Sequence, residues 1–267
     1  MDIQFAGHLQ LFCAVLAFFL GHFLLIAGAA YLLVWQLGGE RLAHRRIQAR
    51  PRAAKPWLEL QYSVLSILIF SVLVSALWII AETGITRVYF RIDEHGIGWF
   101  LCSIAIMAVV HDTYYYFAHR LMHHRRVFRH VHLLHHSFSN PTPFASYAFH
   151  PWEALIEVAW FAPLVFLVPI HPAAFAVYVV LLTVLNVVSH LGHEFYPPWV
   201  ARWFITSTHH NMHHSGSRGH YMLYFNLWDR VLRTNMPDYA AKVQAIAGRP
   251  APARAPDVQL DGLLQPG

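Results

Sequence analysis

The sequence has few charged residues, few lysines and few cysteines. Charged residues make up 12% of the 267 residues, against 57% hydrophobic residues, a balance that excludes an ordinary soluble protein. Lys55 and Lys242 are the only lysines, so the net charge of +5 comes almost wholly from arginine. Cys13 and Cys102 both lie inside apolar runs, which predicts small buried hydrophobic residues and no disulfide.

Several common cofactor motifs are also missing. The chain has no HPGG motif of a haem-binding cytochrome b5 module, no set of four cysteines for an iron–sulfur cluster, and no GxGxxG motif for a dinucleotide. It has no HExxH motif, which argues against a zinc hydrolase of that class. If the chain carries out redox chemistry, its electrons must therefore come from another protein.

Long apolar runs predict helices that cross a membrane, because a spanning helix needs about 20 mostly apolar residues. No basic region or cleavage site accompanies the first run, so we expect a retained helix there. The expected fold is an all-α integral membrane bundle of about four transmembrane helices or hairpins, with a cytoplasmic histidine-rich helical cap. The runs cover residues 9–37, 58–81, 97–110 with an aromatic belt at 114–117, and a hairpin of 154–170 and 173–188.

Basic residues predict the orientation of the bundle. The short loop between the first two runs is rich in arginine, and such loops stay in the cytoplasm. Counting spans from that loop puts every histidine cluster on the same, cytoplasmic face. The arginine-rich, lysine-poor composition favours a bacterial source, so we expect a multi-pass protein of the bacterial inner membrane. The basic residues of the loop are Arg41, Arg45, Arg46, Arg50, Arg52 and Lys55.

Histidines are frequent and clustered. Nine of the 21 lie between residues 111 and 150, and seven lie between 190 and 220. The motifs HRLMH, HLLHH and HNMHH have helical spacing, which places two or three imidazoles of each motif on one helix face. So many rings exceed the needs of one tetrahedral ion and predict a cage for two metals. The expected ligands are His119, His123, His132, His135, His136, His210, His213 and His214, with His190 and His193 of the HLGH segment as two further candidates.

Other polar residues near these motifs are candidates for orienting the imidazoles from behind. Asp112 lies two helical turns before a predicted ligand. Glu153 lies three residues after His150, which is itself a candidate, and Glu194 directly follows a predicted ligand. The alternative is that these residues are helix caps or interface charges.

Spacing alone leaves the metal open, because imidazole binds iron, zinc and copper. A haem-binding electron carrier is one alternative, but it requires paired histidines on two facing transmembrane helices, whereas these clusters lie beyond the apolar runs. A metal transporter is another alternative, and it would hold its ligands near the middle of the membrane.

The same segments resemble the sterol desaturase branch of the fatty acid hydroxylase superfamily. HRLMH, HLLHH, PTPFASYAFHPWE, THHNMHH and FNLWDRVLRT follow that family's order and approximate spacing over about residues 99–236. One segment departs from the pattern, since HLGH stands where related hydroxylases carry a wider HxxxH. Pro143, Ser146 and the Trp228-Asp229 pair match family positions that we interpret as structural.

The resemblance implies an enzyme that uses O2 to hydroxylate or desaturate a lipid, with the ten histidines holding two iron ions. The lipid is sterol-like or fatty acyl, and no motif decides between the two reactions. Expected partners are the lipid, the membrane and a separate electron donor, for which the arginine-rich face is a candidate docking surface; no nucleic acid is expected. The implied organisation is a transmembrane hairpin (1–95), a hydroxylase-like catalytic domain (96–240) and a flexible tail (241–267).

Overall fold

The computed structural model describes residues 3–49 and 55–252, and apart from three isolated bridges the regular structure of these residues is helical. Four of its helical segments are long and apolar enough to cross a membrane. The expectation of an all-α, multi-pass membrane protein is confirmed. The spanning segments are α1 (Ile3–Ala30) continued by the π-helical η1 (Tyr31–Leu37), α2 (Pro56–Glu82), α3 (Gly96–Met122) and α8 (Pro172–Ser189).

The apolar run before α8 does not form one long helix. It divides into α6 (Pro151–Ala159) and α7 (Phe161–Leu167), which meet at Trp160, and neither is long enough to span a bilayer. Pro163 lies in the first turn of α7, where a proline is tolerated. The expected hairpin therefore consists of two short helices followed by one spanning helix.

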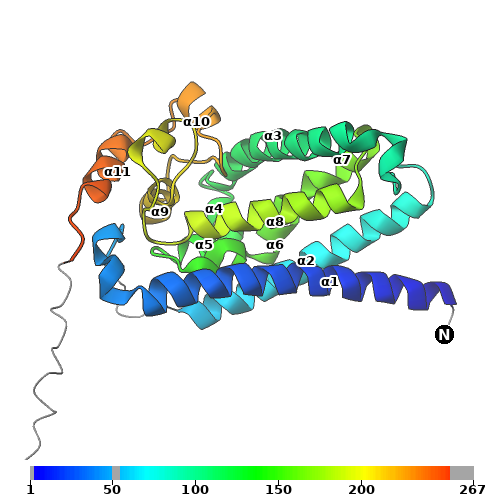
Figure 1. Cartoon of the computed structure of the whole chain (residues 1–267), viewed down its shortest axis with the longest axis horizontal. Helices are drawn as coiled ribbons and strands as arrows, with labels where there is room; N and C mark the ends of the chain where they lie inside the picture. Colours follow the sequence, from blue (N-terminus) through cyan, green and yellow to red (C-terminus); the bar gives the residue numbers. More distant parts are fainter. Residues whose placement is uncertain (1–2, 50–54, 253–267) are drawn as a thin grey trace, which may run out of the picture.

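The bundle has two outer layers with a filled centre (Figure 1). α1 and α2 pack together on one side, α3 lies on the opposite side, and α6, α7 and α8 lie between them. The centre is aromatic, and the rings of Phe161 and Phe175 stack with centroids 4.0 Å apart. Small buried serines on α2, including Ser63 and Ser66, let neighbouring backbones approach closely.

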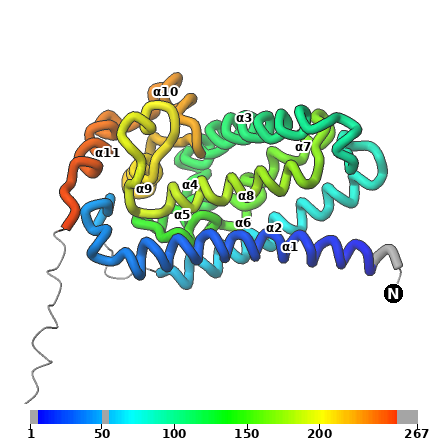
Figure 2. The backbone as a smooth tube through the Cα atoms, viewed as in Figure 1, coloured from blue at the N-terminus to red at the C-terminus, as the bar shows by residue number. Residues whose placement is uncertain are grey.

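Short helices form a cap on one end of the bundle. Figures 1 and 2 show this end at the left, where the connection that follows α1 and the C-terminal helix α11 also lie. The cap thus occupies the same end as the described part of the arginine-rich loop, which includes Arg41, Arg45 and Arg46; Arg50 and Arg52 lie outside the described residues. Its helices are α4 (Phe128–Val131), α5 (Leu133–His136), α9 (Ser207–Gly216), α10 (Trp228–Val231) and α11 (Tyr239–Ala247). The remaining short turns are η2 (Gly39–Arg45), η3 (Ile92–Glu94), η4 (Pro143–Tyr147) and η5 (Pro198–Arg202).

The C-terminal segment is ordered beyond the predicted start of the tail. The boundary expected at residue 240 falls inside α11, whose Val243 and Ile246 are buried. Val243 packs with Met212 of α9. The first part of the segment expected to be flexible is thus part of the cap, and residues 253–267 of that segment lie outside the described residues.

The two cysteines differ from the expectation. Both carry free thiols, as predicted, but Cys13 of α1 and Cys102 of α3 are exposed rather than buried. They lie on the outward faces of apolar spanning helices, where a small hydrophobic side chain contacts lipid instead of protein. An apolar neighbourhood in the sequence therefore did not distinguish a lipid-facing position from a core position.

Asp229 joins the segments of the cap. Its carboxylate accepts hydrogen bonds from the backbone N–H groups of Tyr221 and Met222, at 3.0 and 2.9 Å, and from the Thr234 hydroxyl at 2.6 Å. It also lies 3.3 Å from Nε2 of His209 in α9. Burial alone would raise the pKa of Asp229, but the hydrogen bonds from His209 and Thr234 lower it below its usual range.

We predict that Asp229→Ala destabilises the protein by about 3–5 kcal/mol, because it leaves several buried donors without an acceptor. The apparent midpoint of thermal unfolding in detergent should fall by roughly 6 °C or more. Asp93→Ala is the control, since Asp93 pairs with Arg91 on the exposed surface. Equal midpoints for the two variants would contradict the role assigned to Asp229.

Candidate metal centre

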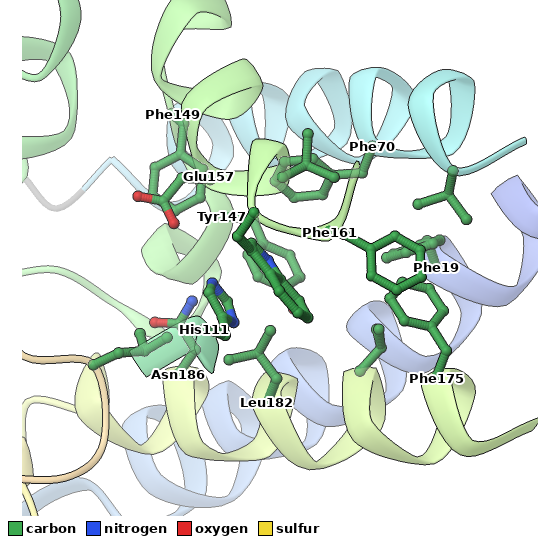
Figure 3. A pocket seen from close by; sticks show the side chains of 15 residues that line it. Phe19, Phe70, His111, Tyr147, Phe149, Glu157, Phe161, Phe175, Leu182 and Asn186 are labelled. Carbon is green, nitrogen blue, oxygen red and sulfur yellow. The ribbon is translucent and has the colours of Figure 1, made fainter. Parts of the chain in front are cut away.

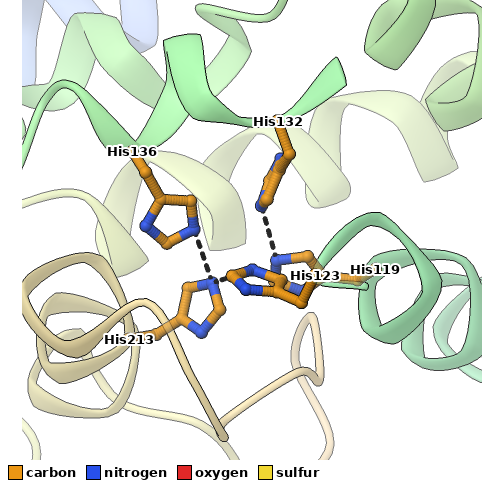
Figure 4. A group of neighbouring side chains, drawn as sticks. All are labelled: His119, His123, His132, His136 and His213. Atoms are coloured by element: carbon orange, nitrogen blue, oxygen red, sulfur yellow. Dashed lines mark hydrogen bonds between the residues drawn. The ribbon is translucent and has the colours of Figure 1, made fainter. Parts of the chain in front are cut away.

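Nine histidines converge in two neighbouring groups within the cap. In each group, one nitrogen from every ring lies within 4.8 Å of the others. The first histidine group, shown in Figure 4, consists of His119, His123, His132, His136 and His213. The second histidine group consists of His135, His190, His210 and His214. The predicted convergence of distant imidazoles is present in the structure.

The two HH doublets divide between the groups. In α5, His135 belongs to the second group and His136 to the first. In α9, His213 belongs to the first group and His214 to the second. Neighbouring residues on a helix point about 100° apart, so a doublet reaches two sites at once. The rings of His136 and His214 have centroids 5.1 Å apart, which places the two groups side by side.

The outer nitrogen of most rings in the first group is anchored to an acceptor. The Nδ1–H groups of His119, His123 and His213 donate to the backbone carbonyls of Tyr221, Ser217 and Gly219, at 3.0, 3.0 and 2.6 Å. A carbonyl can only accept, so Nδ1 must carry the proton of these neutral rings. The opposite nitrogen, Nε2, then presents a lone pair to the interior of the group.

Burial keeps these rings neutral. It lowers the pKa of His123 to about 4 and, together with repulsion from His123, lowers that of His136 to about 3. Burial likewise lowers the pKa of His213 well below its usual value. At neutral pH these rings are therefore neutral, which is the form that binds a metal.

The inner nitrogens of the first histidine group lie as close together as ligands of one ion would. Nε2 of His119 and Nε2 of His132 are 3.0 Å apart, and Nε2 of His213 is 3.0 Å from that of His136. Such a pair of nitrogens either shares one proton in an N–H···N hydrogen bond or points two lone pairs at one cation. Two nitrogens that each bind one ion at about 2.1 Å would be separated by about 3 Å. The first histidine group therefore fits a transition metal.

The second histidine group has the same arrangement. Nδ1–H of His190 donates to the Asn186 carbonyl at 2.8 Å, and that of His135 donates to the Ala148 carbonyl at 3.3 Å. Nε2 of His210 lies 3.0 Å from Nε2 of both His190 and His214. Burial lowers the pKa of His190 to about 4. The donor set is again all imidazole, which suits iron, zinc or copper and not magnesium or calcium.

Glu153 is the predicted carboxylate that contacts a ring. Its Oε1 lies 2.6 Å from Nδ1 of His132, and both side chains are buried. Burial and the neighbouring Glu157 raise the pKa of Glu153, whereas a cation on the far side of the imidazole would lower it. When Glu153 is ionised it accepts the Nδ1–H proton of His132 and makes Nε2 a stronger donor to a metal.

The other predicted polar residues hold backbone rather than rings. Asp112 accepts hydrogen bonds from the N–H groups of residues 223 and 224, at 3.2 and 3.0 Å. Glu194 accepts one at 3.0 Å from the N–H of Thr208, at the beginning of α9. His150 caps α6, where its ring accepts from the N–H of Trp152 at 3.3 Å. Asp112 and Glu194 thus position segments that supply ligands or their acceptors.

His193 lies outside both histidine groups. Its Nδ1 donates to the Leu191 carbonyl at 3.1 Å, and its ring meets Trp35 edge to face. The segment around it is tied to η1, because Trp35 donates to the Leu191 carbonyl at 2.9 Å. It is also tied to the connection after η1, because the N–H of Ile47 donates to the Gly192 carbonyl at 3.1 Å. The HLGH segment therefore joins the cap to the first spanning helix.

The carbonyl acceptors were not predicted from the sequence. Two of them, Ser217 and Gly219, belong to the SGSRG segment that directly follows HNMHH. Ser217 and Gly219 have positive φ angles of 50° and 66°, which turn their carbonyls back toward the rings. The glycine-rich composition after the third motif was the available signal for this turn.

Comparison with known proteins agrees with this geometry. Residues 104–234, which include all nine grouped histidines, match the fatty acid hydroxylase family model. The chain belongs to the fatty acid hydroxylase family. This confirms the resemblance derived from the histidine motifs. No solved structure matches the chain.

The curated relatives are distant and longer. A rat lathosterol oxidase is 32% identical over 176 residues, which cover 65% of this chain and 58% of the relative. A Delta(7)-sterol 5(6)-desaturase of Gibberella zeae is 30% identical over 200 residues, 73% of this chain and 62% of the relative. A rat methylsterol monooxygenase 1 is 30% identical over 135 residues, 50% of this chain and 46% of the relative. The alignments thus span about half to three fifths of these relatives.

We predict that His213→Ala and His214→Ala each lower the bound transition metal from about two ions per chain to one or fewer. Each substitution removes one inward-facing nitrogen from one group. Metal content of the purified protein, measured by mass spectrometry, tests this. His124→Ala is the matched control, because His124 is exposed and belongs to neither group. Unchanged metal content in both ligand variants would contradict the proposed cage.

We predict that Glu153→Ala weakens metal binding about 10- to 100-fold, because the His132 ring loses the acceptor that orients it. Glu153→Gln should lose less, since the amide oxygen still accepts from Nδ1–H. Competition with a chelator of known affinity measures the effect. Glu82→Ala is the control, being the same residue type at the exposed end of α2. An equal loss in the alanine and glutamine variants would argue against an orienting hydrogen bond.

Proposed function

We propose that this protein is a membrane-bound non-haem di-iron oxidoreductase that uses O2 to hydroxylate or desaturate a lipid. The observation that carries the proposal is the pair of adjacent, all-imidazole groups at one end of a spanning bundle. The names of the three relatives described above all refer to sterols, which favours a sterol-like lipid over a fatty acyl chain. The rings within a group are too close for a porphyrin to lie between two of them, which disfavours the haem alternative.

We propose the nine grouped histidines as the ligands of two iron ions. Iron is chosen on the family's chemistry, since the nitrogen donors alone would also suit zinc or copper. We assign His193 to anchoring its segment. In this proposal residues 96–240 form the catalytic domain, residues 1–95 form a transmembrane hairpin, and the tail begins after α11.

When bound, the metal pair supplies O2 activation and the removal of hydrogen from an unactivated carbon. The protein's own residues hold neutral imidazoles, keep each Nε2 pointing inward through Nδ1–H hydrogen bonds, and exclude bulk water. His119 and His213 have no exposed surface, so solvent does not reach the centre from their side. A dry site of this kind protects a reactive oxidant from side reactions.

A separate protein must supply the electrons, because the sequence lacks the common redox modules. We propose that an acidic carrier docks on the exposed arginines of the cap, which include Arg125, Arg126 and Arg129. The arginine-rich loop at the same end of the bundle supports a cytoplasmic location for this face. The composition supports the inner membrane of a bacterium.

Deletion of the gene should remove at least one hydroxylated or desaturated lipid during aerobic growth, and its unmodified precursor should accumulate. Comparative lipid mass spectrometry of the deletion strain and its complement measures this. Complementation with His135→Ala should fail, whereas His124→Ala should restore the product. Identical lipid profiles in all four strains would overturn the proposal.

A further inference from the structure

An aromatic cavity extends from the second histidine group into the bundle. It lies between α1, α2, α3, α6, α7 and α8, and its lining is mostly aromatic and aliphatic. Figure 3 shows that its two ends differ: Phe19, Phe161 and Phe175 lie at one end, whereas Phe149, His111, Glu157 and Asn186 gather toward the other. The cavity thus has an apolar end and a polar end.

The polar end adjoins the metal centre. The ring of Phe149 lies 5.1 Å from the ring of His135, and the backbone carbonyl of Asn186 accepts the Nδ1–H hydrogen bond of His190. Both of these histidines belong to the second group. A lipid in the cavity would therefore place its polar end beside the second histidine group. Its apolar body would lie farther from that group.

His111 presents an unsatisfied nitrogen at this end. The side chain is 3% exposed, and its Nε2 has no hydrogen-bond partner in the described part of the chain. Its ring stacks on Trp160 with centroids 4.4 Å apart, which fixes its orientation. A buried polar atom without a partner costs about 1–3 kcal/mol, and an ionisable residue within a span is a candidate for function.

Hydrogen bonds behind His111 decide the role of that nitrogen. The Tyr224 hydroxyl donates to the carbonyl of Ala108, so its oxygen is left to accept. The Tyr178 hydroxyl lies 3.3 Å from the Tyr224 oxygen and 2.6 Å from Nδ1 of His111. When Nδ1–H donates to Tyr178 and Tyr178 donates to Tyr224, every proton in this series of hydrogen bonds has an acceptor. If Tyr178 donated to Nδ1 instead, the proton would move to Nε2, which has no acceptor among the described residues. Nε2 of His111 is then an acceptor facing the cavity.

Building on the proposed function, we propose that His111 selects a neutral lipid alcohol by accepting the hydrogen bond of its hydroxyl group at Nε2. The apolar body of the lipid occupies the aromatic end of the cavity. The carbon that reacts then lies near the hydroxyl-bearing end of the molecule. A ketone or ether offers no donor, and a fatty acid carboxylate would place a negative charge against the lone pair, so these lipids bind less well.

The test uses iron-loaded protein in lipid nanodiscs and three radiolabelled sterols that differ at one position: a ring alcohol, the matching ketone and the methyl ether. We expect the native protein to bind the alcohol at least tenfold more tightly than either analogue. His111→Phe keeps a ring against Trp160 but removes the acceptor, so this preference should fall to about twofold or less. His111→Gln retains a hydrogen-bond acceptor in its amide oxygen and should recover part of the preference for the alcohol.

Phe175→Leu is the matched control at the apolar end of the cavity. It should weaken binding of all three sterols by a similar factor and leave the preference for the alcohol unchanged. A second arm with a long-chain alcohol and its methyl ether distinguishes a chain lipid from a ring lipid. The proposal is supported if, in either arm, the native protein prefers the alcohol and His111→Phe loses that preference.

Three results would overturn this inference: equal affinity of the native protein for the alcohol and its methyl ether in both arms, an unchanged preference in His111→Phe, or no saturable binding of either alcohol. Product formation with O2 and a reductant, measured on the same samples, separates it from the proposed function. Product without a preference for alcohols refutes only the role of His111. A preference dependent on His111 without any product refutes only the oxidase assignment.

Discussion

The convergence of nine buried imidazoles is the constraint on which this structure depends. Burial keeps the rings neutral, carbonyl and carboxylate acceptors fix the proton on the outer nitrogen, and the inner nitrogens are left about 3 Å apart. A cation bound between the rings would satisfy their inward-facing nitrogens together. The cap is accordingly built to hold the rings from outside, with Asp229, Asp112 and Glu194 all accepting backbone N–H groups of the segments that surround the two groups.

The sequence was most informative about the membrane bundle. Runs of apolar residues predicted the four spanning helices because length and hydropathy alone decide whether a helix can cross a bilayer. The same criterion failed for residues 154–170, where a continuous apolar run hides the change of direction at Trp160. It also failed for Cys13 and Cys102, since lipid and protein core are equally apolar surroundings. The order of α11 depends on its packing against α9, which composition does not reveal.

For the metal centre, residue type and spacing indicated which histidines converge, but not which of the two groups each histidine joins. Rings four residues apart, such as His119 and His123, stay in one group, whereas His132 and His135, three apart, separate into different groups. Glu153 was singled out for its distance from His150, yet it contacts His132, 21 residues away in the chain. Such pairings depend on how α5 and α6 meet, and backbone acceptors such as Tyr221 carry no side-chain signal at all.

The HH doublets of α5 and α9 have a consequence for assembly. Because each of these short helices contributes one ring to each group, the placement of either helix fixes histidines of both groups at once. Ordering of one group should therefore accompany ordering of the other. Inserting or deleting one residue within either helix would turn the histidines of both groups away together.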